Sequence, residues 1–170
     1  MIGTILCDLS KAFDTLPHDL LIAKLNAYGL SHSALEFISS YLSNRKQRCK
    51  VGSSFSSWGD ITSGVPQGSV LGPLLFNIFM NDFFFFIKKS STTNFADDNT
   101  LYAYGDSLDE VIYKLEEDIE NALHWFDLNK MVANPDKFQI MFLGTREKTK
   151  LCLDINGKRS ISTSSVTLLA

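Results

Sequence analysis

Two groups of aspartates carry the clearest potential for chemistry in this sequence. Asp8 ends a strand-like run, and Asp97 and Asp98 lie between two short runs of β-prone residues. Like charges held this close repel one another, so the pKa of one rises unless a cation neutralises them. Mg²⁺ typically takes one or two carboxylates together with substrate phosphates. The pattern favours phosphoryl transfer by two metal ions about 4 Å apart, although paired aspartates in a turn are more often a solvated tip.

The segments around these aspartates should bring them together. Residues 92–96 and 99–104 are separated only by Asp97 and Asp98, which is the spacing of a tight hairpin. Residues 2–9 form another strand-like run that ends at Asp8. If these aspartates share one pair of metal ions, their carboxylates should converge from neighbouring strands. A span above about 10 Å would exceed what ions about 4 Å apart can bridge.

Helical periodicity and turn signals predict the other elements. Asp14 should cap a helix that runs to about Tyr28 and stops at Gly29. Residues 107–110 form a capping box ahead of apolar residues at helical spacing. Further predictions are a helix opened by Ser31, a strand pair over residues 47–51 and 55–61, a core helix within residues 70–87, strands over residues 137–143 and 166–170, and a type I′ turn at residues 156–157. The mixture lacks a regular βαβ rhythm and indicates an antiparallel sheet backed by helices on one face.

Composition limits the function classes. The net charge of -3 argues against a stand-alone nucleic-acid-binding protein, which usually carries a basic surface. One dense basic cluster consists of Arg45, Lys46, Arg48 and Lys50. It fits contact with nucleic acid or, equally well, a solvated edge strand. Gly72, Pro73 and Asn77 interrupt the most apolar stretch, which favours a core helix over a membrane span. Three scattered cysteines without zinc spacing favour an intracellular setting.

Four segments together resemble the reverse transcriptases of non-LTR retrotransposons. Residues 8–14 (DLSKAFD) are similar to motif A, and residues 64–73 (GVPQGSVLGP) to motif B in its non-LTR form. Residues 95–98 (FADD) are similar to motif C, and residues 134–137 (NPDK) stand where motif D belongs. Order and spacing match over nearly the whole chain. Residues 1–170 are therefore identified as a partial reverse transcriptase domain, a palm with motifs A to D.

The resemblance implies roles for individual residues. Asp8, Asp97 and, less directly, Asp98 would hold two Mg²⁺ ions, with Mn²⁺ as an alternative ion. Residues of the nucleotide-binding site would be Leu9, Ser10, Lys11 and Ala12 along the triphosphate, Phe13 as the gate that excludes a ribose 2′-OH, and Gln67 and Gly68 near the nascent base pair. Lys137 is a candidate general acid for the pyrophosphate. Without the motif, core packing would explain Phe13 better, and a solvated lysine explains Lys137 nearly as well.

The resemblance also implies the wider setting. The fold would be an α+β polymerase palm with the fingers and most of the thumb missing. The activity would be RNA-templated DNA synthesis from an RNA template, a DNA primer and dNTPs, in the nucleus and away from membranes. The rest of a retrotransposon polyprotein, with fingers, thumb and an endonuclease, would complete the enzyme. Since those parts would grip the substrates, we expect no measurable polymerase activity from residues 1–170 alone. The alternatives are an inactive truncated remnant, or the palm of a group II intron maturase or telomerase.

Overall fold

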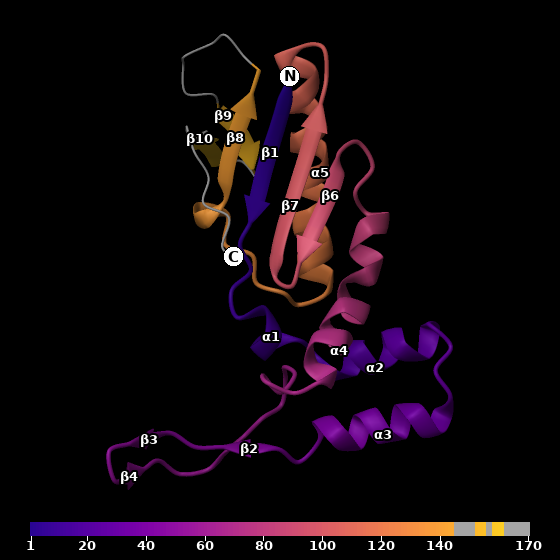
Figure 1. Cartoon of the computed structure of the whole chain (residues 1–170), viewed down its shortest axis with the longest axis vertical. Helices are drawn as coiled ribbons and strands as arrows, with labels where there is room; N and C mark the ends of the chain where they lie inside the picture. Colours follow the sequence, from indigo (N-terminus) through magenta and orange to yellow (C-terminus); the bar gives the residue numbers. More distant parts are fainter. Residues whose placement is uncertain (145–151, 156–157, 162–170) are drawn as a thin grey trace. The chain divides into compact units, whose positions relative to one another are not determined.

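A four-stranded antiparallel sheet in the order β6-β7-β1-β8 organises the first of two compact units (Figure 1). The computed structural model describes residues 1–144, 152–155 and 158–161. The first unit contains Met1–Ser10 and the described part of Asn81–Ala170, and the second contains Lys11–Met80. The strands of the sheet are β1 Ile2–Cys7, β6 Ser91–Phe95, β7 Asp98–Tyr104 and β8 Gln139–Leu143. The predicted antiparallel sheet backed by a helix on one face is confirmed.

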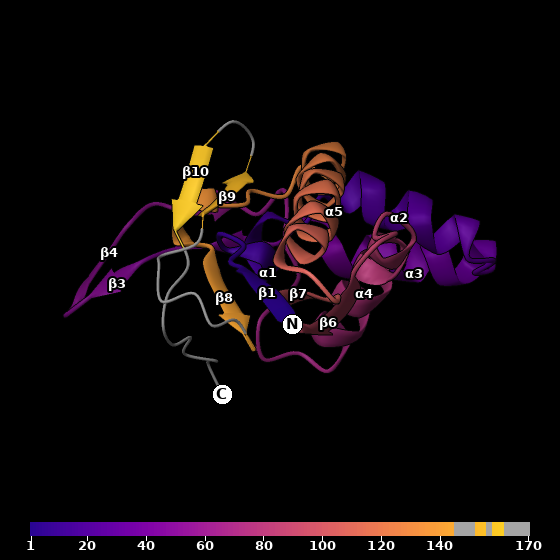
Figure 2. The ribbon, with the colours of Figure 1, turned by 90° about the horizontal axis from the view of Figure 1, so that it is seen from above.

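The face of the sheet that packs on α5 (Leu108–Leu128) holds the core of this unit (Figure 2). Every second residue of β1 points to this face, and Ile5 and Cys7 are buried there. The buried residues of α5 recur at helical spacing and are Val111, Leu115, Asp118, Ile119, Ala122, Trp125 and Phe126. Burial of the two apolar faces against each other is what holds the helix on the sheet.

The start of α5 differs in one detail from the predicted capping box. Ser107 Oγ accepts a hydrogen bond from the backbone N–H of Glu110, as expected. The Glu110 carboxylate instead accepts from the backbone N–H of Asp106, one residue before the predicted partner. Glu110 also pairs with Lys114 one turn along the helix, and this competition draws its carboxylate away from the reciprocal capping position.

The hairpin between β6 and β7 is confirmed, but its turn lies one residue earlier than predicted. Phe95 pairs with Asp98, so the two turn residues are Ala96 and Asp97, and Asp98 begins β7. Ala96 adopts a left-handed backbone conformation with φ 54°. Two-residue hairpin turns need positive φ at the first central position, and the turn takes this conformation even though alanine stands there.

The second unit is helical apart from one long two-stranded arm. Its helices are α1 Ala12–Thr15, α2 His18–Ala27, α3 His32–Leu42 and α4 Leu71–Met80, and its strands are β2 Lys46–Gln47, β3 Lys50–Val51, β4 Ser54–Phe55 and β5 Gly59–Asp60. The expected cap at Asp14 is wrong: Asp14 lies inside α1, and Pro17 occupies the N-cap of α2 without a side-chain hydrogen bond. Ser31 caps α3 and Gly29 has φ 88°, as the sequence predicts.

The most apolar stretch of the sequence forms α4 and then the 3-10 helix Asn81–Phe85. Leu75, Phe76 and Phe79 of α4 are buried, which confirms the predicted core helix. None of the helices in the described part of the chain is both long and apolar enough to cross a membrane.

The last described elements belong to the first unit. Residues Pro135–Lys137 form a short 3-10 helix before β8. The strand predicted over residues 137–143 therefore begins at Gln139, two residues later than predicted. Strands β9 (Cys152–Ile155) and β10 (Lys158–Ile161) pair as a hairpin, with β9 beside α5 (Figure 2). The predicted turn at residues 156–157 and strand at residues 166–170 lie outside the described residues.

A buried carboxylate joins α5 to the chain ahead of β6. Asp118 accepts hydrogen bonds from the backbone N–H groups of Lys88, Lys89 and Ser90 at 2.5–2.8 Å and from Ser90 Oγ at 2.7 Å. Burial by itself would raise the pKa of Asp118. These hydrogen bonds outweigh burial and hold the pKa below its usual value, because they favour the charged form.

Gly3 provides a first test of the packing between sheet and helix. A Cβ atom on Gly3 would come within 2.7 Å of Leu115 Cδ1 and Val111 Cγ1. We expect Gly3→Ala to lower the free energy of unfolding in urea by about 1–3 kcal/mol through overpacking. Gly59→Ala is the matched control, since its nearest neighbour would be Gln47 O at 3.9 Å, and it should change stability by less than about 0.5 kcal/mol. Equal stabilities for the two variants would contradict this account.

Asp118 provides a second test, through the pH dependence of stability. A lowered folded-state pKa stabilises the protein above the ordinary aspartate pKa of about 3.9, and this contribution is lost as the pH falls through the folded value. We expect Asp118→Asn to cost about 2–3 kcal/mol near neutral pH and much less in acid, measured by urea unfolding across pH. Asp127→Asn, on the exposed side of the same helix, should have little effect at any pH. A pH-independent loss in Asp118→Asn would show that only shape matters at this position.

Candidate active site

The register of β1 against β7 places Asp8 beside Asp98. The last pair of this ladder is Cys7 with Asn99. If the antiparallel register is continued by one residue, Asp8 lies opposite Asp98. Cys7 and Asn99 are buried on the α5 face, and because side chains alternate, both aspartates point to the opposite face of the sheet. The two aspartates are half-buried there. The register therefore brings the backbones of the two aspartates side by side, and the convergence of their carboxylates stays a prediction.

The three carboxylates of this corner interact electrostatically. Burial raises the pKa of Asp98, and the negative charges of Asp97 and then of Asp8 raise it further. Burial and the two neighbouring charges therefore all disfavour the ionised form of Asp98. A cluster of this kind favours binding of a cation, since a positive charge removes the repulsion.

The segment that follows α5 brings a lysine to the same corner. The Asp8 carbonyl accepts from Asn134 N at 3.3 Å, and Ser10 N donates to the Val132 carbonyl at 2.8 Å. This backbone pairing fixes the segment against the end of β1. Lys137 Nζ lies 3.5 Å from Asp8 Oδ2, with both side chains substantially exposed to solvent. The predicted general acid is thus adjacent to the predicted catalytic carboxylate.

The described side chains of Asp8, Asp97 and Asp98 are not arranged as a ready-made metal site. Among the described residues, no three His, Cys, Asp or Glu side chains form a group positioned to hold a metal ion. The assignment of the three aspartates as metal ligands stays a prediction.

Asn99 supports the hairpin tip from the buried side, and sequence reasoning missed it. Its side chain is 1% exposed, and Nδ2 donates to the Asp97 carbonyl at 2.9 Å. Asn99 Oδ1 and Nδ2 of the opposite Asn94 have no hydrogen-bond partner among the described residues. A buried amide behind a turn is costly unless it holds that turn in place. The available signal was a polar residue on the buried side of an alternating strand, directly after the aspartate pair.

The predicted nucleotide-binding residues are divided between the two units. Leu9 and Ser10 belong to the first unit, where Leu9 is buried and forms a bridge with Ala133. Lys11, Ala12, Phe13, Gln67 and Gly68 belong to the second. The Leu9 and Ala12 side chains are both buried, so only their backbone groups could contact a triphosphate.

Within the second unit, the turn of motif A and the loop of motif B are joined tightly. Val65 N donates to the Phe13 carbonyl at 2.8 Å, and Gly64 N donates to the Leu16 carbonyl at 2.7 Å. Gly64 has φ 83°, and a Cβ atom there would lie 2.5 Å from the Asp14 carbonyl oxygen. Only glycine permits both the conformation and this close approach of two backbones.

Side chains of the two motifs also meet. Gln67 Nε2 donates to Asp14 Oδ1 at 2.9 Å. The half-buried Phe13 ring stacks on Phe76, with ring centroids 4.2 Å apart. A cleft of about 560 Å³ in this unit is lined by residues that include Lys11, Asp14 and Gln67. Gly68 has φ 76°, with open space around the position of a Cβ atom.

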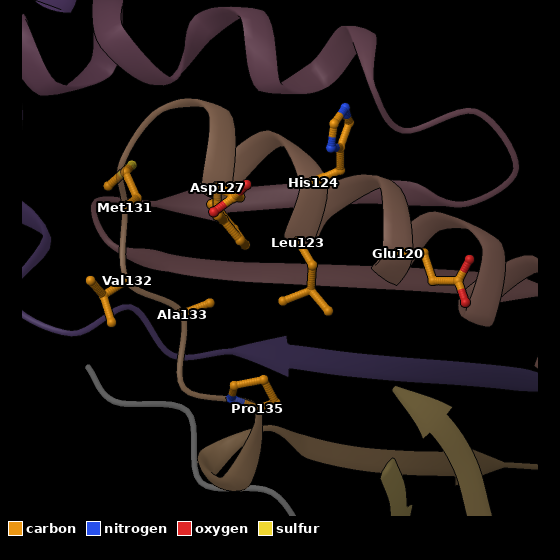
Figure 3. Close-up of a pocket in the computed structure, with 9 residues that line it drawn as sticks. Glu120, Leu123, His124, Asp127, Met131, Val132, Ala133 and Pro135 are labelled. Atoms are coloured by element: carbon orange, nitrogen blue, oxygen red, sulfur yellow. The ribbon is translucent and has the colours of Figure 1, made fainter. Parts of the chain in front are cut away.

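The first unit has a further groove, of about 700 Å³, beside the C-terminal half of α5 (Figure 3). Its lining residues are Glu120, Leu123, His124, Phe126, Asp127, Met131, Val132, Ala133 and Pro135. No residue that the sequence predicts for the site lines it.

The penalty on the charged form of Asp98 should appear in the pH dependence of protein stability. A raised folded-state pKa means that the charged form destabilises the fold, and that this penalty disappears as the pH falls through the folded pKa. We therefore expect Asp98→Asn to raise the thermal unfolding midpoint near neutral pH, with the gain vanishing in acid. Glu120→Gln, an exposed position on α5, should show no such gain. A less stable Asp98→Asn protein near neutral pH would show that burial and repulsion together do not penalise the charged form of Asp98.

Comparison with known proteins finds a matching family and several relatives. The family described as reverse transcriptase (RNA-dependent DNA polymerase) matches residues 3–168. The chain is 30% identical over 148 residues to the "Probable RNA-directed DNA polymerase from transposon BS" of Drosophila melanogaster, which covers 79% of this chain and 16% of that protein. It is 35% identical over 107 residues to the RNA-directed DNA polymerase from mobile element jockey of Drosophila funebris, covering 62% of this chain and 11% of that protein. The chain thus spans about a sixth or less of the length of these relatives.

A solved structure shows the same fold. Telomerase from Candida albicans, in complex with the TWJ fragment of telomeric RNA, matches with a TM-score of 0.63 at 16% identity. The match covers 95% of this chain and 30% of that one. Together with the mobile-element relatives, it agrees with the resemblance that motifs A to D predict. The chain belongs to the reverse transcriptase family.

Proposed function

We propose that this chain is the catalytic palm of a polymerase that copies RNA into DNA by two-metal nucleotidyl transfer. The observation that carries the proposal is the register that sets Asp8 beside Asp98, with Asp97 in the adjoining turn. The raised pKa of Asp98 supports it, because burial and then the nearby charges of Asp97 and Asp8 disfavour the ionised form of this carboxyl. Perturbed groups of this kind cluster at functional sites.

Asp8, Asp97 and Asp98 fit Mg²⁺ or Mn²⁺ through the chemistry of their oxygen donors, and they would hold the ions after reorienting their side chains. Bound ions would neutralise the charge of the triphosphate and activate the primer 3′-oxygen. The chain's own part is to fix the donors. The Asn99 amide holds the turn that carries Asp97, and the backbone pairing of Asn134 with Asp8 fixes the end of β1.

Other residues would position and select the nucleotide. The primer 3′-hydroxyl would lose its proton to water as its oxygen bonds to the α-phosphorus and the bond to pyrophosphate breaks. Lys137 would donate a proton to that leaving group. Phe13, held by its stacking on Phe76, would exclude a ribose 2′-OH by a clash and so select dNTPs. Gln67 and Gly68 would lie near the nascent base pair, and the backbone of residues 9–12 along the triphosphate.

The partners in this proposal are an RNA template, a DNA primer and the rest of a retrotransposon polyprotein. The relatives named for mobile elements support it. The proposed place of action is the nucleus, where such an element would reach chromosomal DNA.

One observation favours a second candidate, an inactive remnant of such an element. The carboxylates of the described residues do not form a group that could hold a metal ion. A remnant would keep the fold and lose the chemistry. The two candidates differ in whether the aspartates reorient when substrates and ions are present.

Primer extension on an RNA template with dNTPs and Mg²⁺ decides between them. Residues 1–170 would replace the matching segment of the jockey polymerase, so that the substrates are gripped by the rest of that enzyme. We expect the graft to extend the primer, and Asp97→Asn to reduce extension at least roughly 100-fold by removing charge stabilisation. Glu120→Gln is the control for a lost carboxylate. A folded graft that binds primer–template as the parent does, yet extends nothing, would favour the remnant.

A further inference from the structure

The strands β2 to β5 form an exposed arm with a charge unlike the rest of the chain. This basic arm comprises residues 45–60 and carries four cations, Arg45, Lys46, Arg48 and Lys50, against the single carboxylate of Asp60. The whole chain, by contrast, carries 16 basic and 19 acidic residues. The arm is built from two short ladders, Lys46–Gln47 with Gly59–Asp60 and Lys50–Val51 with Ser54–Phe55. Figure 1 shows β2, β3 and β4 in an extended hairpin.

Aromatic rings stand exposed among these cations. Phe55 is 50% exposed and Trp58 is 59% exposed. The Arg48 guanidinium carbon lies 4.0 Å from the Phe55 ring centroid and 4.5 Å from that of Trp58. Lys50 Nζ lies 5.4 Å from the Phe55 centroid. Cation and ring therefore form one continuous surface.

A solvated edge strand accounts for the cations but not for the rings. Every residue from 45 to 60 is exposed, so neither Phe55 nor Trp58 contributes to a core. Two exposed rings that share the same arginine give an apolar surface suited to interaction with a partner. The cation–π contacts hold the rings at the surface, in contact with solvent, and limit their rotamer freedom before any partner arrives.

The base of the arm adjoins the cleft of the second unit. Arg45, Gln47 and Asp60 line that cleft together with Lys11 and Gln67. A strand lying along the arm would thus reach residues that the proposed function assigns to the nucleotide and template.

We propose that the basic arm is a binding site for single-stranded nucleic acid. The bound strand would be the template, and to that extent the inference rests on the proposed function. Bases would stack on Phe55 and Trp58, and phosphates would lie against Arg48 and Lys50. Stacking is tolerant of sequence, which suits a template that changes with every nucleotide added. Acidic side chains could pair with the cations, but they offer no ring to stack on Phe55 and Trp58.

The experiment measures binding of the 170-residue chain to a labelled single strand of about 16 nucleotides by fluorescence anisotropy, between about 50 and 200 mM salt. Arg48→Gln with Lys50→Gln should weaken binding and reduce the slope of log affinity against log salt by about 1.4. Lys88→Gln with Lys89→Gln removes two exposed charges from the first unit and should change the slope little. Phe55→Ala and Trp58→Ala should each weaken binding roughly 5- to 150-fold without changing the slope. Trp58→Phe keeps a ring and should retain most of the affinity.

Two results would overturn the inference. One is affinity and salt slope in the arm variants equal to those of the Lys88 and Lys89 control. The other is competition by polyglutamate as strong as that by polyuridylate, which would point to an acidic protein partner. The assay needs neither catalysis nor metal. Binding through the arm by a chain whose jockey graft extends no primer would therefore count against the proposed function alone. Extension by a graft that is indifferent to the arm variants would count against this inference alone.

Discussion

The pairing of β1 with β7 is the constraint on which the candidate active site depends. Ile5 and Leu101 face each other in this ladder, and both are fully buried. Side chains alternate along a strand, so a slip of one residue would turn the apolar residues of one strand away from α5. The same slip would move Asp8 to the helix side of the sheet. Apolar burial therefore fixes the register, and the register fixes the carboxylates.

Two carboxylates of the first unit show opposite uses of charge. Asp118 is enclosed by backbone N–H donors that favour its ionised form, and it joins α5 to the chain before β6. Asp98 is partly buried and faces two other carboxylates, and both conditions disfavour its ionised form. A fold gains stability from the first arrangement and loses some through the second. Retention of an unfavourable cluster at a half-exposed corner is what a cation-binding function would require.

The second unit shows how a glycine-rich motif acts through backbone contact. Gly64 approaches the Asp14 carbonyl more closely than any side chain would allow, and Val65 bonds to the Phe13 carbonyl. Segments separated by about fifty residues in the chain are thereby held as one structure. The basic arm leaves this structure between the two motifs, which places its cations and rings on the same unit as the cleft that the motifs line.

The sequence by itself determined the elements whose signals are local. Apolar periodicity and turn residues predict three such features, and the structure contains all of them: the helix over residues 108–128, the Ser31 cap and the hairpin around Asp97. Motif order was sufficient to identify the family, because those residue types recur at fixed spacing. Only the tertiary structure decided features that depend on strand register and on packing, which periodicity and turn residues do not specify. These include the turn position set by the Phe95–Asp98 pair, the buried Asn99 amide, and the close approach of Gly3 to α5. The contacts of Arg48 with Phe55 and Trp58 could not be predicted either. The residues next to Arg48 in the sequence do not specify which side chains pack against it when the hairpin forms.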